Sequence, residues 1–203
     1  MATQRERVAQ TNNLITNALV KVGENKALKQ ITVSDLTRTS GISRGTFYLH
    51  YLDKDDLVNQ LEDDFAQQFQ ELLDAGIGET MDYRQMETGQ PYPVIVAIVA
   101  FAAENKALLN FFFGPHGDPA FLGRITTKLQ TAILGELRRV KGSASFRHDI
   151  PATYALNLVT NTIMTIVTTW LTSPEQLSQT EVASLIMRAL YLSPYEILGI
   201  KMK

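Results

Sequence analysis

The chain has 203 residues, of which 45% are hydrophobic and 20% charged, and its formal net charge is −2. This composition is typical of a globular protein and excludes a disordered chain. Cysteine is absent, which excludes disulfides and thiolate metal ligands. The longest apolar run, residues 94–103, is shorter than the roughly 20 residues that a membrane-spanning helix needs, and the first ten residues lack the apolar stretch of a secretion signal. We therefore expect a cytoplasmic protein with no membrane partner.

Charge is divided unevenly along the chain. Residues 1–54 contain eight Lys or Arg and four Asp or Glu, whereas residues 55–203 contain 11 basic and 17 acidic residues. A basic segment in a chain of negative net charge is typical of a part that meets phosphates. The sequence therefore indicates two parts with different partners.

The first two predicted helices have clear start and stop signals. Apolar residues at spacings of three and four predict an amphipathic helix over residues 8–24, closed by Gly23. Thr32 and Asp35 have the spacing of a capping box, which predicts a second helix over residues 33–40 that ends at Gly41.

A third helix follows almost at once. Ser43 is a favourable N-cap for a helix that begins at Arg44, and two helices joined by so short a glycine-containing turn form a helix-turn-helix. On this helix Phe47 and Tyr51 can face the core, which leaves Arg44 and other polar side chains outside. Gly45 costs about 1 kcal/mol of helix propensity relative to alanine. Two interpretations stay open here: a helix that approaches a partner closely, and a core helix with some exposed polar residues.

The rest of the chain predicts further helices and no strand. Asp53 is an N-cap for a long helix whose acidic residues we interpret as a solvated face rather than a metal site. Residues 75–93 are rich in glycine, proline and polar residues and predict a loop. The remaining predicted helices cover residues 94–104, 105–113, 119–140, 151–172 and 180–192, the last opened by a second capping box. The predicted fold is all-α, with about nine helices in total.

The stretch ITVSDLTRTSGISRGTFYLHYLDKDDL, residues 31–57, resembles the DNA-binding domain of the TetR family of bacterial transcriptional regulators. The positions that carry the resemblance are Thr32, Gly41, Ile42, Ser43, Gly45, Thr46, Tyr48, His50, Lys54 and Leu57. The chain departs from the family pattern at Thr37 and Ser40, where small apolar residues are usual. A second stretch, FFFGPHGDPAF, residues 111–121, is similar to a motif of one branch of the family common in low-GC Gram-positive bacteria.

The resemblance implies a three-helix DNA-binding domain over residues 1–54 and a helical effector-binding and dimerisation domain over residues 55–203. It implies a homodimer that pairs through the helices at 151–172 and 180–192 and binds a palindromic, double-stranded operator as a ligand-responsive repressor. Arg44 and Thr46 would read bases. The residues implied to contact DNA are Thr32, Ser34, Arg44, Gly45, Thr46, Tyr48, Leu49, His50 and Lys54.

The small-molecule effector is unknown, and we expect no cofactor and no metal. Aromatic and amide side chains in the larger domain suit a ligand pocket, although at helical spacing they are equally well explained as core. These candidates are Phe101, Phe111, Phe112, Asn157, Met164 and Trp170.

Catalysis is not expected. Glu104, His116 and Asp118 are the nearest approach to an acid–base or metal cluster, but a turn rich in glycine and proline favours a capping role for the last two. The alternative to a DNA-binding regulator is a helical module that senses a ligand or binds a protein partner, and whose helix-turn-helix does not bind DNA.

Overall fold

The computed structural model describes residues 3–174 and 177–200, and every regular element in this part of the chain is a helix. All nine predicted helices are present. Their bounds are α1 Gln4–Gly23, α2 Val33–Ser40, α3 Arg44–Tyr48, α4 Lys54–Gly76, α6 Pro93–Glu104, α7 Lys106–Phe113, α8 Pro119–Lys141, α9 Ala152–Thr172 and α10 Gln179–Ala189. The all-α fold is therefore confirmed.

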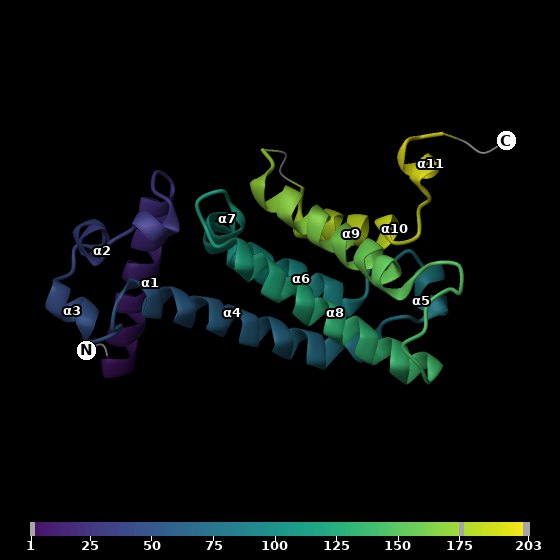
Figure 1. Ribbon diagram of the computed structural model, residues 1–203, viewed down its shortest axis with the longest axis horizontal. Coiled ribbons are helices and arrows are strands. Elements are labelled where there is room, and N and C mark those ends of the chain that lie inside the picture. Colours follow the sequence, from purple (N-terminus) through teal and green to yellow (C-terminus); the bar gives the residue numbers. More distant parts are fainter. Residues whose placement is uncertain (1–2, 175–176, 201–203) are drawn as a thin grey trace. The chain divides into compact units, whose positions relative to one another are not determined.

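The helices form two compact units. One unit comprises the chain up to Ala66 together with Ala107–Leu122, and the other comprises Gln67–Lys106 together with the chain from Gly123 onward. We call them the N-terminal unit and the C-terminal unit. In the N-terminal unit, α2 packs against both α1 and α3 (Figure 1).

The helix-turn-helix begins and ends where its capping residues stand. The Thr32 hydroxyl accepts a hydrogen bond from the Asp35 amide, and the Asp35 carboxylate accepts one from the Thr32 amide, which completes the predicted capping box. Gly41 ends α2 in the left-handed conformation at φ 75°, where a side chain would be strained. Ser43 caps α3 by accepting from the Thr46 amide at 2.9 Å.

The third helix is shorter than the sequence predicts, because Tyr51, which is expected on this helix, lies beyond its end. It ends at Tyr48, and Leu49 is its C-cap. The chain then turns so that Asp53 can cap α4, and the Asp53 carboxylate accepts from the Asp56 amide at 2.8 Å. Two strong N-caps ten residues apart leave room for only one short helix and a turn between them.

The core of the N-terminal unit is aromatic. Phe47 is fully buried, and a second cluster joins Phe65 of α4 to Phe112 and Phe121, with ring centroids 5.6 Å and 5.2 Å from Phe121. The acidic residues of α4 do not all lie on a solvated face, since Glu62 is only 3% exposed. It shares a buried face with Val58 and Phe65, which are four and three residues away along the helix.

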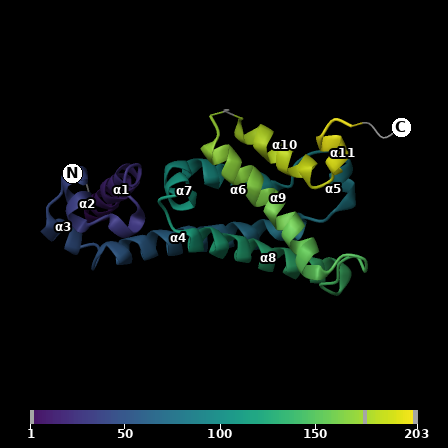
Figure 2. The ribbon, with the colours of Figure 1, turned by 45° about the horizontal axis from the view of Figure 1, so that its top comes forward.

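In the C-terminal unit, α6, α9 and α10 pack on one another (Figure 2). The region 75–93 is not the open loop that the sequence predicts, because α4 continues to Gly76 and is followed by a 3-10 turn, Ile77–Glu79, and a short helix, α5, Tyr83–Glu87. Gly76 is a packing residue: a Cβ there would lie 2.8 Å from Cβ of Val94. A further short helix that we did not predict, α11, Pro194–Ile197, opens with its own capping box.

No single helix within the described ranges is both long and apolar enough to cross a bilayer. The consecutive helices α6 and α7, taken together across their break, pass the same test by length and composition only.

Candidate nucleic-acid interface and ligand cavity

The candidate DNA-binding side chains lie on the two short helices of the N-terminal unit, on the turn after them and, for Lys54, at the start of α4. Seven of the nine belong to α2, its cap, α3 or the α3 cap, and their exposure sets them apart from the buried Phe47 beside them. Tyr48 is 55% exposed and Leu49 is 84% exposed. Such large exposed side chains on a short helix are typical of a surface that meets a partner.

Arg44 is held at the surface by the neighbouring helix. Its Nη2 donates to the Ser34 hydroxyl at 2.5 Å, so that the side chain spans from α3 to α2. The hydroxyls of Ser43 and Thr46 lie 2.9 Å apart at the start of the same helix. The structure thus brings together four polar side chains from both helices on one exposed face, which we call the α2–α3 face.

Gly45 lies on this face, and its missing side chain is not explained by the fold. A Cβ at this position would contact only the Ser43 hydroxyl, at 3.6 Å, which is an ordinary van der Waals distance. Gly45 is exposed and its φ is not positive. The backbone here is therefore open to approach from outside.

The Lys54 side chain is less available to bind a phosphate than the sequence suggests. Its side chain is only 16% exposed, its ammonium donates to the Leu28 carbonyl at 3.2 Å, and it pairs with Asp55 at 2.7 Å. A cation at the start of α4 still adds positive potential beside the helix N-terminus, but much of its hydrogen-bonding capacity is used inside the unit. His50 is half-buried with its ring 6.2 Å from that of Tyr51.

Asp35, at the start of α2, forms ion pairs with two basic side chains. Its carboxylate accepts from the Lys26 ammonium at 2.6 Å and from Arg38 at 3.0 Å. The Lys26 hydrogen bond, followed by those from Thr32, holds the pKa of Asp35 well below its ordinary value, against the opposing effect of burial. The carboxylate is therefore ionised at neutral pH and fixes one side of the capping box.

The turn between α7 and α8 contacts the end of α1 and the 3-10 turn Leu28–Gln30 within the N-terminal unit. The Leu28 amide donates to the His116 carbonyl at 2.7 Å, and Nδ1 of His116 lies 3.1 Å from the Gly23 carbonyl. A Cβ on Gly23 would lie 2.2 Å from the ring of Phe111. The stretch 111–121 thus supplies core aromatics, a tight turn and a hydrogen-bonded contact to the end of α1.

An apolar cavity of about 330 Å³ lies within the C-terminal unit. Its walls come from α4, α6, α8, α9 and α10, and from the segments 77–81 and 146. A volume of this size falls in the range of roughly 300–1,000 Å³ typical of small-molecule sites. Sequence reasoning missed these residues, because isoleucine and leucine at helical spacing are typical of any core.

The six ligand candidates from the sequence do not line one cavity. Phe111 and Phe112 belong to the aromatic core of the N-terminal unit, while the others lie in the C-terminal unit. Trp170 is buried, donates to the Leu177 carbonyl at 2.8 Å and has the Lys106 ammonium 5.9 Å from its ring centroid. None of the six lines the apolar cavity.

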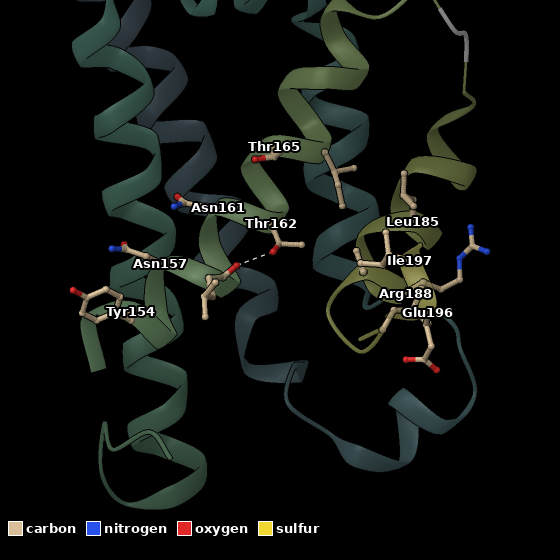
Figure 3. Close-up of a pocket in the computed structure, with 13 residues that line it drawn as sticks. Tyr154, Asn157, Asn161, Thr162, Thr165, Leu185, Arg188, Glu196 and Ile197 are labelled. Atoms are coloured by element: carbon tan, nitrogen blue, oxygen red, sulfur yellow. Dashed lines mark hydrogen bonds between the residues drawn. The ribbon is translucent and has the colours of Figure 1, made fainter. Parts of the chain in front are cut away.

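Asn157 instead borders a groove of about 740 Å³ on α9, α10 and α11. Figure 3 shows Tyr154, Asn157 and Asn161 of α9 on one side, with Leu185, Arg188, Glu196 and Ile197 on the other. Several apolar side chains here are exposed, including Tyr154 at 69% and Leu158 at 64%. We call this surface the α9–α10 groove.

Two residues of the candidate acid–base cluster, His116 and Asp118, have structural roles. His116 contacts the end of α1, and the Asp118 carboxylate accepts from the Ala120 amide at 2.8 Å to cap α8. Across residues 3–174 and 177–200, no group of three or more His, Asp or Glu side chains is arranged to hold a metal ion.

Known proteins similar to this chain are transcriptional regulators. Residues 89–191 match the family model TetR_C_8, described as "Transcriptional regulator C-terminal region". The chain is 29% identical over 115 residues to YxbF of Bacillus subtilis, an uncharacterized HTH-type transcriptional regulator. That match covers 56% of this chain but only 29% of the length of YxbF.

Solved structures show the same fold. The chain is similar to a TetR transcriptional regulator from Streptococcus agalactiae, with a TM-score of 0.57 and 20% identity over 92% of this chain and 97% of that one. It is also similar to the fatty acid degradation regulator FadR from Bacillus halodurans, with a TM-score of 0.61 and 19% identity over 89% and 94% of the two chains.

Proposed function

The chain belongs to the TetR family of transcriptional regulators, and from that premise we propose that it is a ligand-responsive repressor that binds a palindromic operator as a homodimer. The DNA-binding domain in this proposal is residues 1–54, and the effector-binding and dimerisation domain is residues 55–203. A regulator of this kind acts on the chromosome, so we place it in the bacterial cytoplasm, without catalytic activity.

The observation that carries the proposal is the α2–α3 face. Arg44 is exposed and held toward Ser34, and a guanidinium in this position suits the O6 and N7 atoms of guanine in the major groove. Thr46 offers a methyl group to thymine. Gly45 lies between them, and its open backbone lets the helix approach the bases closely.

Phosphate contacts would fix the position of this helix on the duplex. We assign them to side chains that surround the reading face: the hydroxyls of Thr32, Ser34 and Tyr48, the imidazole of His50 and, in part, the ammonium of Lys54. Leu49, the most exposed apolar residue of the turn, would contact sugar or base methyl groups. Lys54 contributes mainly through its charge, because its ammonium already binds the Leu28 carbonyl.

A homodimer would present two such faces. We propose that it forms through the α9–α10 groove, where exposed apolar side chains alternate with Asn157, Asn161 and Arg188. A two-fold axis makes one surface meet its own copy, and two recognition helices related by that axis read a palindrome. A ligand in the apolar cavity that favours a different spacing of the two helices lowers DNA affinity, and DNA lowers ligand affinity by the same factor.

The experiment is selection of bound sequences from a random duplex pool by the full-length protein at about 0.15 M salt, near physiological ionic strength. We expect the wild-type protein to select a palindrome. Arg44→Ala should change the base preference, whereas Tyr48→Phe should weaken binding and leave the base preference unchanged. Arg147→Ala is the control, because Arg147 pairs with Asp149 in the other unit and should leave the selected sequence unchanged. Binding without any sequence preference would instead support a sensing module that does not read DNA.

A further inference from the structure

The chemistry of the apolar cavity identifies a class of ligand. Resting on the proposed role of the cavity as the effector site, we propose that the ligand is an uncharged, mostly apolar molecule with one hydrogen-bond donor, such as a long-chain alcohol. The donor would bind the hydroxyl oxygens of Tyr92 and Tyr191, which both line the cavity and lie 3.3 Å apart. Three features of the lining support this class.

The first feature is the absence of charge. Most of the described side chains that line the cavity are aliphatic or aromatic, and none of them is ionisable at neutral pH. Representative members from different elements are Ile77, Ile98, Ile133, Leu137, Phe146 and Ile163. A carboxylate or an ammonium that entered this space would lose its water without gaining a partner, which disfavours any charged occupant.

The second feature is that a buried carboxylate next in sequence to the cavity lining is already neutralised. Glu136, one residue before the cavity residue Leu137, is 3% exposed and accepts from Arg139 at 2.7 Å. Arg139 also donates to the Gly78 carbonyl at 2.7 Å. The guanidinium is thus committed to a carboxylate and a backbone oxygen, and it does not offer a site for an anionic ligand.

The third feature is the direction of the polar hydrogen bonds. Tyr92 has one hydroxyl proton, and it goes to the Asp82 carbonyl at 3.2 Å. The Tyr191 hydroxyl, 3.3 Å from that of Tyr92, must therefore be the donor in the pair. Thr80 likewise gives its proton to the Ile77 carbonyl at 2.7 Å. The described cavity hydroxyls already donate their protons within the protein, so they can only accept a hydrogen bond from a ligand.

Tyr191 also stays protonated. Burial, and then the hydrogen bond with Tyr92, raise the pKa of Tyr191 far above its ordinary value. The Tyr191 oxygen is therefore a neutral acceptor, which suits an alcohol or N–H donor. A carboxylate has only acceptor atoms at neutral pH, so it meets acceptors rather than donors here.

The test uses the full-length protein without DNA. N-phenyl-1-naphthylamine, a neutral apolar fluorophore, is bound first and then displaced at pH 8 by 1-decanol, by decanoate or by decyl methyl ether. We expect decanol to bind at least about tenfold more tightly than decanoate, because the carboxylate is left without a donor. The ether, which has no donor, should bind more weakly than the alcohol.

Two variants assign the site. Ile98→Trp fills the cavity and should abolish displaceable fluorescence while far-UV circular dichroism remains native. The double variant Tyr92→Phe with Tyr191→Phe removes both acceptor oxygens, so decanol and its methyl ether should then bind equally. Fluorophore binding that survives in folded Ile98→Trp, decanoate binding as tight as decanol, or binding of none of the three probes would each overturn the proposal.

Failure of the proposed ligand class and failure of the proposed function give different results. Operator binding is measured on the same protein in the absence of any probe, so a protein that binds its operator yet prefers decanoate contradicts only the ligand class. A protein that prefers decanol but has no operator keeps the ligand class and contradicts the regulator.

Discussion

Asp35 is the residue on which the start of the helix-turn-helix most depends. Its carboxylate accepts hydrogen bonds from the Thr32 amide at 3.0 Å, the Thr32 hydroxyl at 2.8 Å and the Lys26 ammonium at 2.6 Å. A charged acceptor with several donors contributes more than a neutral one. Because these contacts depress the pKa of Asp35, they stabilise the folded protein only while the carboxylate is ionised.

We expect Asp35→Asn to lower the free energy of unfolding by about 1.5–3 kcal/mol at pH 7. The folded pKa lies below the unfolded value near 3.9, so the contribution is complete above about pH 5 and is lost as the pH falls further. Urea unfolding at a series of pH values measures both effects. Glu24→Gln, an exposed site with the same charge change, is the control, and equal losses in the two variants would contradict this role.

At the scale of the elements, sequence patterns predicted the helices whose start is set by local chemistry. The capping boxes at Thr32 and Ser178 and the left-handed Gly41 are confirmed, because caps depend on residues within one turn. Gly23 and Gly76 are understood only from the structure, since their small size admits Phe111 and Val94 from distant segments. The cavity was also beyond prediction, because its walls come from five helices whose apolar periodicity is that of any core.

Gly23 tests the contact between α1 and the α7–α8 turn. We expect Gly23→Ala to lower the free energy of unfolding by about 1–3 kcal/mol, since the new methyl group would overlap the Phe111 ring. Gly135→Ala, in the exposed middle of α8 with nothing within 4 Å, should instead raise it by about 0.5–1 kcal/mol. Chemical denaturation followed by circular dichroism compares the two. A Gly23 variant as stable as the wild type would show that the turn does not pack there.

At the scale of the whole molecule, the proposed regulator depends on self-association. The α9–α10 groove exposes several large apolar side chains, among them Tyr154 and Leu158, and Arg188 has no ion pair within the described ranges. Both properties suit an isologous interface, in which each residue meets the same surface on the second copy.

Sedimentation should give twice the chain mass of 22.7 kDa for the wild type. Leu158→Asp, which places a charge on a side chain now 64% exposed, should give the monomer mass with unchanged helicity. Leu52→Asp is the matched control, because Leu52 is 81% exposed on the other unit and should leave the dimer intact. A dimer that tolerates Leu158→Asp would move the interface elsewhere.

The central claim is that the α2–α3 face is shaped for DNA rather than for the fold, and Gly45→Ala tests it most directly. The fold has room for the new methyl group, so the free energy of unfolding should stay the same or rise by up to about 1 kcal/mol. We predict that affinity for the selected operator, measured by fluorescence anisotropy, nevertheless falls about tenfold or more, because the methyl group blocks close approach of the helix. Gly123→Ala, equally unobstructed, should leave the affinity unchanged. A Gly45→Ala protein that binds the operator as tightly as the wild type would contradict the account.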